Sequence, residues 1–177
     1  MPELPEVETT VRGLASVLDG EVLSRVEPRR ADLRRPIPPD LRQRLTGARI
    51  TGLRRRAKYG MIDTDRGDTL VFHLGMSGSL FFASALAPRG AHDHFELETS
   101  QGHLRLHDPR RFGAVVFAES EQSPIAVKLL GHLGIEPLSD AFDAGSFSRG
   151  VKQRRSAVKE VLLAGDLVVG VGNIYAC

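Results

Sequence analysis

The sequence predicts an α+β fold: an amphipathic N-terminal helix, an antiparallel β-sandwich, and then the first helices of a second domain. Three observations predict it. The chain starts with a helical apolar period, continues with many short β-branched and aromatic segments, and returns to helical patterning after Glu119. Its 177 residues, 41% hydrophobic and 26% charged, are enough to bury a core and typical of a globular protein.

The N-terminal helix is the clearest predicted element. Its apolar residues recur at spacings of three and four, which places them on one face: Leu4, Val7, Val11, Leu14 and Leu18. Pro5 suits the first turn, where its missing N–H would have no helical partner, and Gly20 suits the end. The start of the chain is therefore expected to be tethered to a packed helix.

The middle of the chain, from Glu21 to about Glu119, predicts strands separated by Gly, Pro and Asp. The candidate strands are Val22–Val26, Ala48–Arg56, Met61–Thr64, Thr69–Gly75, Ser79–Ala83, His94–Thr99, His103–His107 and Ala114–Ala118. Their number and short connections favour a mostly antiparallel sandwich. Two stretches, Arg34–Asp40 and Pro88–Asp93, are expected to be loops.

Helices are expected after Glu119. One covers Ile125–Leu133, Ser139–Gly150 forms a connection, and a basic helix spans about Lys152–Ala164. From Gly170 the pattern indicates a tight turn that opens another helix. We expect a hinge near 134–139, which divides the chain into a domain of residues 1–134 and the start of a helical domain at 135–177.

Composition excludes several classes of protein. No apolar run approaches the roughly 20 residues of a membrane span, and the start carries carboxylates where a signal peptide carries positive charge, so we expect a cytoplasmic protein. The single Cys177 excludes an internal disulfide and a thiolate zinc site made from this chain alone.

Basic residues are grouped along the chain although the net charge is only +2. The groups are Arg29, Arg30, Arg34 and Arg35; Arg54, Arg55, Arg56 and Lys58; Arg110 and Arg111; and Lys152, Arg154, Arg155 and Lys159. Such groups can bind nucleic-acid phosphates, and they can equally be solvated faces.

Pro2 is the most unusual candidate for chemistry. Removal of Met1 would leave a secondary amine at the chain end, and an α-amine titrates near pH 8, so part of it is neutral and nucleophilic at physiological pH. Attack on a sugar C1′ would give an iminium ion that eases proton loss at C2′. One residue could thus remove a base and then cut the strand.

Glu3 lies next to this candidate nucleophile, and Glu6 lies one helical turn further along the chain. One carboxyl group can donate a proton to the opening sugar ring while the other holds the amine. Spacing alone favours a plainer alternative, in which Pro2 only directs methionine removal and the glutamates cap a helix.

Three further motifs carry candidate residues. Lys58 in RRRAKY can contact phosphates or transfer a proton, or it can lie on a solvated strand edge. Met76 in HLGMSG can project from a glycine turn or fill a core. In DPRRFG, Arg110 and Phe112 can fill the gap left by an extruded nucleotide, or Phe112 can be buried beside surface arginines.

Histidines offer a metal site as another possibility, because His92 and His94 share a face of a strand. No cysteine or carboxylate spacing completes a recognisable site, so phosphate contact or structural hydrogen bonding is preferred. A histidine-metal nuclease stays open as a rival, and cleavage that survives EDTA would remove it.

In this order, the motifs MPELPEVETTVRGL, RRAKY, HLGMSGSL, HDH, DPRRFGA, HLGIEPLSD and VVGVGNIYA resemble the bacterial formamidopyrimidine-DNA glycosylase family, often called MutM. The resemblance spans Met1 to Cys177. The start also resembles this branch more than the endonuclease VIII branch, whose start typically reads PEGPE.

The resemblance implies a DNA repair glycosylase and AP lyase. Such an enzyme excises oxidised purines, 8-oxoguanine opposite cytosine and ring-opened formamidopyrimidines, from double-stranded DNA and cuts abasic sites by β,δ-elimination. By motif position, Pro2 would be the Schiff-base nucleophile, Glu3 the proton donor and Lys58 a group acting in elimination and phosphate contact.

The resemblance also implies roles for residues outside the chemistry. Met76, Arg110 and Phe112 would fill the void in the duplex, with Arg110 facing the orphan cytosine. His92, Arg154 and Asn173 would bind the DNA backbone, Asn173 from the turn of a helix–two-turn–helix element. We expect a monomer in the bacterial cytoplasm, associated with the nucleoid through its substrate.

One departure from the family pattern concerns the C-terminal part. Family members continue past GNIYA into more helices and a four-cysteine zinc finger, whose hairpin arginine is assigned to δ-elimination. We expect no cofactor within residues 1–177 and weak DNA binding by this chain, as part of a longer protein or a product lacking its second half. A rival hypothesis is therefore a DNA-binding fragment without catalysis.

Overall fold

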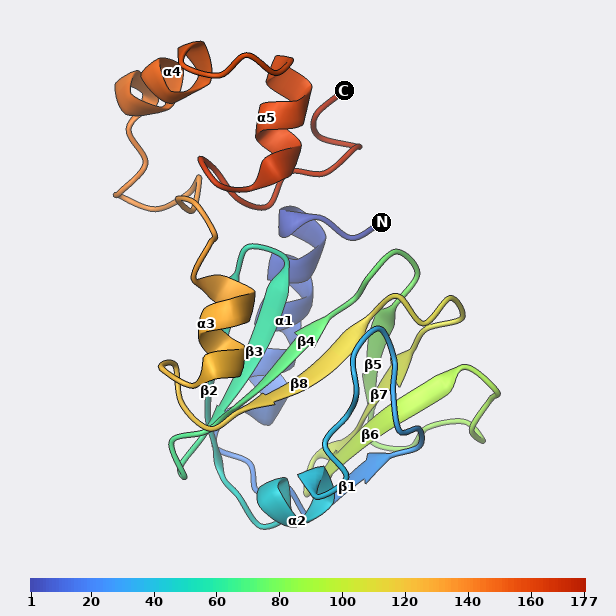
Figure 1. Ribbon diagram of the computed structural model, residues 1–177. Coiled ribbons are helices and arrows are strands. Elements are labelled where there is room, and N and C mark those ends of the chain that lie inside the picture. The colour runs from blue at the N-terminus through green and yellow to red at the C-terminus, as the bar shows by residue number, and fades with distance from the viewer.

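The computed structural model describes residues 1–177 and confirms the predicted α+β class (Figure 1). Its elements are α1 (Leu4–Leu18), β1 (Arg25–Pro28), α2 (Leu41–Leu45), β2 (Ile50–Arg56), β3 (Tyr59–Thr64), β4 (Thr69–His73), β5 (Ser79–Ala83), β6 (Asp93–Thr99), β7 (Gly102–His107), β8 (Ala114–Ala118), α3 (Pro124–Leu130), α4 (Ala144–Lys152) and α5 (Val158–Ala164).

The strands form two four-stranded sheets in the orders β1-β6-β7-β5 and β2-β3-β4-β8, with every pair antiparallel. Inward side chains alternate along the strands, as a sandwich requires. Phe95, Leu97 and Leu104 from the first sheet join Ile62 and Phe72 from the second in one buried cluster of 20 residues. The main core therefore lies between the sheets.

The flanking helices α1 and α3 cover the sandwich at different places. All five predicted apolar residues of α1 are buried, and the helix lies against β2 and β3. The outer face of the second sheet carries a smaller cluster, in which Leu129 of α3 packs with Met61 and Val71. The five buried residues of α1 fix this helix to the sandwich along its length, so the start of the chain has a defined position.

The helical segment after α3 departs from the sequence prediction. The expected connection at Ser139–Gly150 is wrong, because α4 occupies Ala144–Lys152. Its N-cap is Asp143, whose carboxylate accepts a hydrogen bond from the Ser146 N–H (2.6 Å). The basic helix expected over Lys152–Ala164 is confirmed only for its second half, α5, since residues 153–157 separate α4 from α5. α2 was not predicted, because two buried leucines in five residues give too short a pattern.

The last segment returns to the start of the chain. The carbonyl of Gly170 accepts a hydrogen bond from the Leu4 N–H (3.1 Å), and residues 173–176 form a turn rather than a regular helix. Figure 1 shows the N-terminus between the sandwich and the helical segment, and the C-terminus beside α5. No helix combines the length and the apolar character needed to cross a membrane.

Candidate active site at the N-terminus

Glu3 is the best-defined side chain of the candidate site. Although it is charged by type, it is 0% exposed. Its carboxylate accepts hydrogen bonds from the backbone N–H groups of Gly172 (2.5 Å), Ile174 (2.7 Å) and Tyr175 (3.3 Å). The predicted proton donor is therefore held by a turn about 170 residues further along the chain.

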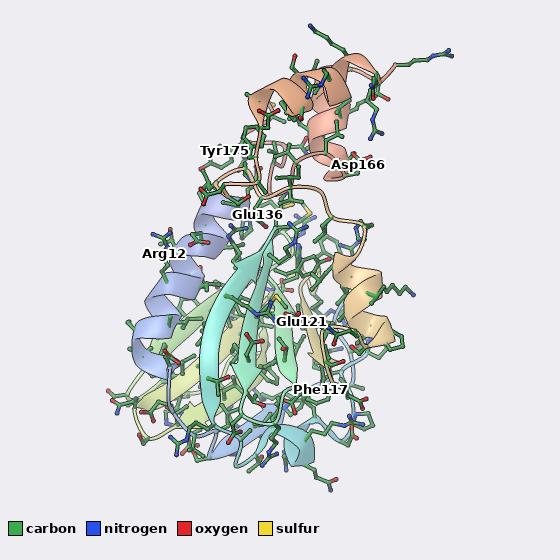
Figure 2. The ribbon with its side chains drawn as sticks, turned by 90° about the vertical axis from the view of Figure 1, so that its left-hand side faces the viewer. Arg12, Phe117, Glu121, Glu136, Asp166 and Tyr175 are labelled. Atoms are coloured by element: carbon green, nitrogen blue, oxygen red, sulfur yellow. The ribbon has the colours of Figure 1, made fainter.

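Glu6 fastens the same region from the first turn of α1. One oxygen accepts a hydrogen bond from the Glu3 N–H (2.9 Å) and the other from the Tyr175 hydroxyl (3.2 Å). The hydrogen bond from the Glu3 N–H is the largest influence on the pKa of Glu6, which lies below its usual value. Glu6 thus caps the helix, as the plainer alternative expected, and also joins the helix to the C-terminal turn (Figure 2).

Lys58 approaches the same turn from the β2–β3 hairpin. A Cβ atom on Gly172 would lie 2.5 Å from Glu3 Oε1 and 2.7 Å from Lys58 Nζ, so both side chains converge on this glycine. Burial lowers the pKa of Lys58, and the negative charge of Glu3 acts in the opposite direction. A lysine with a lowered pKa has a larger neutral fraction, which proton transfer requires.

The three arginines before Lys58 do not form a free basic surface. Arg54 pairs with Asp63 (2.6 Å), Arg55 with Glu8 (2.6 Å), and Arg56 donates to the Gly134 carbonyl (2.6 Å). Lys58 makes no such ion pair. Within this group, only Lys58 could bind a phosphate without breaking an ion pair.

Pro2 lies between Met1 and the buried Glu3 and is partly exposed. While Met1 is present, the Pro2 nitrogen is an amide and cannot act as a nucleophile. Met1 itself lines a cleft of about 700 Å³ together with His73, Gly75 and Arg34. Removal of Met1 would therefore place a free amine at this cleft.

The three expected void-filling residues line the same cleft. Met76 and Phe112 are 44% and 42% exposed, and the Arg110 guanidinium carbon lies 4.9 Å from the centroid of the Phe112 ring. Exposed large apolar side chains beside an arginine suit insertion into stacked bases. The structure thus brings Met76, Arg110 and Phe112 together and excludes the alternatives in which Met76 or Phe112 fills a core.

Asp108 holds the two loops that carry these residues, and the sequence analysis did not single it out. It is fully buried, and its carboxylate accepts hydrogen bonds from the Ser77 hydroxyl (2.8 Å) and the Gly113 N–H (2.8 Å). Gly75 contacts the Phe112 backbone so closely that a Cβ there would lie 2.4 Å from its carbonyl carbon. The sequence contains no signal for these contacts, because the loops are about 30 residues apart.

His73 also lines the cleft, beside Lys58 and Arg34. Burial, with the charges of Arg34 and Lys58, lowers its pKa to about 4. Its Nδ1 accepts a hydrogen bond from the Gly75 N–H (2.9 Å), and its ring lies 5.0 Å from that of Tyr59. A neutral His73 therefore supports the turn before Met76, a role that the sequence did not indicate.

The expected backbone-binding residues lie at three separate places. Asn173 is exposed in the turn that holds Glu3, so it is close to the candidate site. His92 is exposed on the loop before β6. Arg154 lies between α4 and α5 and is paired with Asp166 (2.7 Å). Of the three, only Asn173 adjoins the carboxylate.

Metal-binding side chains are not grouped in this chain: no three His, Cys, Asp or Glu residues lie close enough to hold an ion. The histidine cluster considered from the sequence is thus not formed as a three-residue metal site. The four-cysteine finger that the resemblance implies does not fit these residues either, because Cys177 is the only cysteine.

Comparisons with known proteins agree with the geometry. The family model for the formamidopyrimidine-DNA glycosylase N-terminal domain matches residues 1–115, and the model for the H2TH domain of the same enzymes matches residues 133–177. The formamidopyrimidine-DNA glycosylase of Variovorax paradoxus is 56% identical over 179 residues, and that of Albidiferax ferrireducens is 57% identical over 176 residues. Each alignment covers 99% of this chain and 64% of the relative.

Solved structures of the same enzymes share the fold. Lactococcus lactis formamidopyrimidine-DNA glycosylase, non-covalently bound to DNA containing an abasic site, superposes with a TM-score of 0.87 at 33% identity, over 98% of this chain and 66% of that one. A MutM complex with DNA containing carbocyclic 8-oxoguanine gives 0.87 at 34% identity, over 99% and 65%. This chain, which spans about 64% of the length of its curated relatives, therefore belongs to the formamidopyrimidine-DNA glycosylase family.

Proposed function

We propose that this chain carries the catalytic groups of a DNA glycosylase and AP lyase that acts on oxidised purines, with Pro2 as the nucleophile. The observation that carries the proposal is the Glu3 carboxylate, fully buried and bound to three backbone amides, directly beside a residue that becomes a secondary amine when Met1 is removed. A structural cap would not need such burial, because helix-capping carboxylates are ordinarily solvated.

The reaction begins at the sugar of the damaged nucleotide. The Pro2 nitrogen attacks C1′, the bond from C1′ to the base breaks, and the base leaves with a proton. Glu3, which has taken up a proton from water before this step, then protonates O4′ as the O4′–C1′ bond breaks and becomes a carboxylate, and the nitrogen lone pair forms the iminium ion. A positioned proton donor contributes about 10²–10⁴ in rate to such a step.

Strand cleavage follows from the iminium ion. Loss of a proton from C2′ drives departure of the 3′-phosphate, and loss of a second proton drives departure of the 5′-phosphate. Lys58 accepts a proton or contacts a phosphate in these steps, and the lowering of its pKa by burial supports the first of these roles. Water finally hydrolyses the imine and restores the amine.

Substrate engagement uses the edge formed by Met76, Arg110 and Phe112. These residues fill the space left by the extruded nucleotide, with Arg110 facing the opposite cytosine, while His92, Arg154 and Asn173 contact the DNA backbone. The proposed substrates are 8-oxoguanine, formamidopyrimidines and abasic sites in duplex DNA. We further propose a monomeric bacterial cytoplasmic protein with domains at residues 1–134 and 135–177.

Borohydride trapping on a duplex with one abasic site tests the proposal. An irreversible protein–DNA adduct is expected when Met1 has been removed, as checked by intact mass, and should vanish in Pro2→Gln, in which a large second residue also retains the methionine. Pro5→Ala changes a proline inside α1, three residues after Pro2, and should still form the adduct. No adduct from the wild-type chain would support a DNA-binding fragment without catalysis.

A further inference from the structure

His107 is the last residue of β7 and has no part in the proposed function. Its Nδ1 lies 2.8 Å from Asp93 Oδ1. The Asp93 carboxylate is also bound by the Gly90 N–H (2.7 Å) and by Arg105 (3.2 Å). Although burial acts against it, the hydrogen bonds from Gly90 and His107 and the charge of Arg105 hold the pKa of Asp93 below its usual value.

The bond to Asp93 determines which hydrogen bonds His107 can offer to a ligand. An ionised carboxylate only accepts hydrogen bonds, so Nδ1 carries the proton. In the neutral ring Nε2 is then an acceptor. Phosphate oxygens are also acceptors, so only the doubly protonated ring can donate from Nε2 to a phosphate. Phosphate binding at His107 is therefore coupled to uptake of a proton.

The surroundings of His107 form a small exposed patch of rings. Its side chain is 35% exposed and lies edge-on to His92, with centroids 5.8 Å apart, and to Phe81 at 6.3 Å. Phe81 on β5 carries no charge. The charged or titratable groups that face His107 are Asp93 from β6, Arg105 from β7 and His92 from the loop.

The patch adjoins the DNA-facing edge of the molecule. The Asp108 N–H, one residue after His107, donates to the His92 carbonyl (2.9 Å), and Asp108 begins the loop that carries Arg110. We propose that protonated His107, together with His92, binds a phosphate of the DNA backbone beside the Met76–Arg110–Phe112 edge. The inference rests on the proposed function, because that function makes duplex DNA the ligand.

Two substitutions separate the two nitrogens of the ring. The amide nitrogen in His107→Asn can replace Nδ1 and keep the bond to Asp93, but nothing replaces Nε2. In His107→Gln the amide nitrogen can reach the place of Nε2 and offers a neutral donor. His103→Asn is the matched control, since His103 lies on the same face of β7, its side chain is 36% exposed, and its Nδ1 is 3.7 Å from Glu98.

The experiment measures the affinity of residues 1–177 for a duplex with a tetrahydrofuran abasic-site analogue, at pH 6 and pH 8 over a salt series. Wild type and His103→Asn should bind more tightly at pH 6. His107→Asn should weaken binding at pH 6 roughly threefold to tenfold and lower the salt slope by about 0.9, the value of one phosphate contact. His107→Gln should bind with little dependence on pH.

Equal affinity of His107→Asn and His103→Asn at pH 6 would overturn the inference, as would a wild-type affinity that does not change between pH 6 and pH 8. Borohydride trapping in parallel separates this failure from failure of the proposed function. Wild type and the control His103→Asn should both form the adduct at saturating protein. Absence of the adduct in wild type would overturn the catalytic proposal, while the affinity comparison would still decide the role of His107.

Discussion

The sandwich and the helical segment after it are held together by different forces. Twenty buried side chains form the main core of the sandwich with α1. After Gly131, by contrast, the only buried hydrophobic residues are Val161, Val168 and Val169, and α4 buries none. The segment is fastened mainly by polar bonds, between Glu3 and three amides and between Glu136 and two arginines.

This difference matters because the candidate site lies where the helical segment contacts the sandwich, a contact called the joint below. Figure 2 shows Glu136 and Tyr175 where the helical segment meets the sandwich. Glu3 belongs to the sandwich side, and the amides that orient it belong to the other side. The geometry of Glu3, the proposed proton donor, can therefore be lost while the sandwich remains folded.

The largest expected effect comes from Glu3→Gln, which removes the proposed proton donor and presents an amide N–H₂ to backbone donors. Base excision from an 8-oxoguanine duplex should fall about 10²–10⁴-fold. Adduct formation at a preformed abasic site should fall much less. The base is already absent there, and the sugar ring opens to the aldehyde without the enzyme. Single-turnover rates on the two substrates measure this split, and equal losses on both would contradict the assigned role.

A core substitution should instead break the sandwich itself. Leu97 is 1% exposed between the sheets, so Leu97→Ala is expected to cost about 2–5 kcal/mol of unfolding free energy. Denaturant titration measures the loss. The matched exterior change Phe81→Ala, on a side chain 52% exposed, should cost about 1 kcal/mol or less. Similar losses for both would show that the core lies elsewhere.

His73 gives the sandwich a defined pH dependence. Its pKa of about 4 in the folded protein lies below the usual 6.5, so the unfolded chain binds the proton first as pH falls. Its contribution to stability is complete above pH 6.5 and is lost towards pH 4, by roughly 3 kcal/mol. Urea titrations should show a smaller decline over this window for His73→Asn than for wild type. An unchanged decline would mean that His73 is not held neutral.

The smallest expected effect is loosening of the joint by Glu136→Gln. Glutamine can still accept from the Ala57 N–H, which lies 2.6 Å from Oε1, but it presents an amide N–H₂ to Arg55. Breaking this pair should cost about 1–3 kcal/mol of docking free energy. Hydrogen exchange at residues 168–176 should accelerate while that of β6 and β7 stays unchanged. Equal acceleration in both regions would contradict a separate joint.

The sequence predicted the sandwich better than the helical segment. All five periodic residues of α1 are buried, and Ser79–Ala83 and Ala114–Ala118 match β5 and β8 residue for residue. In these elements one face packs against the core, so the spacing of the apolar residues in the sequence follows the spacing of the side chains on that face. α4 buries no side chain, so no apolar period could mark its position, and the expected helix from Lys152 was wrong in its start although its end matches α5.

The sequence indicated the residues of the candidate site, but it did not indicate the contacts that hold them in place. Motif position indicated Pro2, Glu3 and Lys58. The amides that bind Glu3 lie about 170 residues away, and the Ser77 partner of Asp108 lies 31 residues away, so no local pattern could reveal either contact. Likewise, the carboxylate partners of Arg54 and Arg55 become visible only in the fold.

The most direct measurement of the central claim maps the covalent bond itself. The wild-type chain is trapped with borohydride on abasic DNA, digested with a protease and a nuclease, and the modified peptide is sequenced by mass spectrometry. The account predicts that the reduced sugar remnant is attached to the nitrogen of Pro2 at the new chain start. Attachment to Lys58 or another lysine, with Pro2 unmodified, would contradict it.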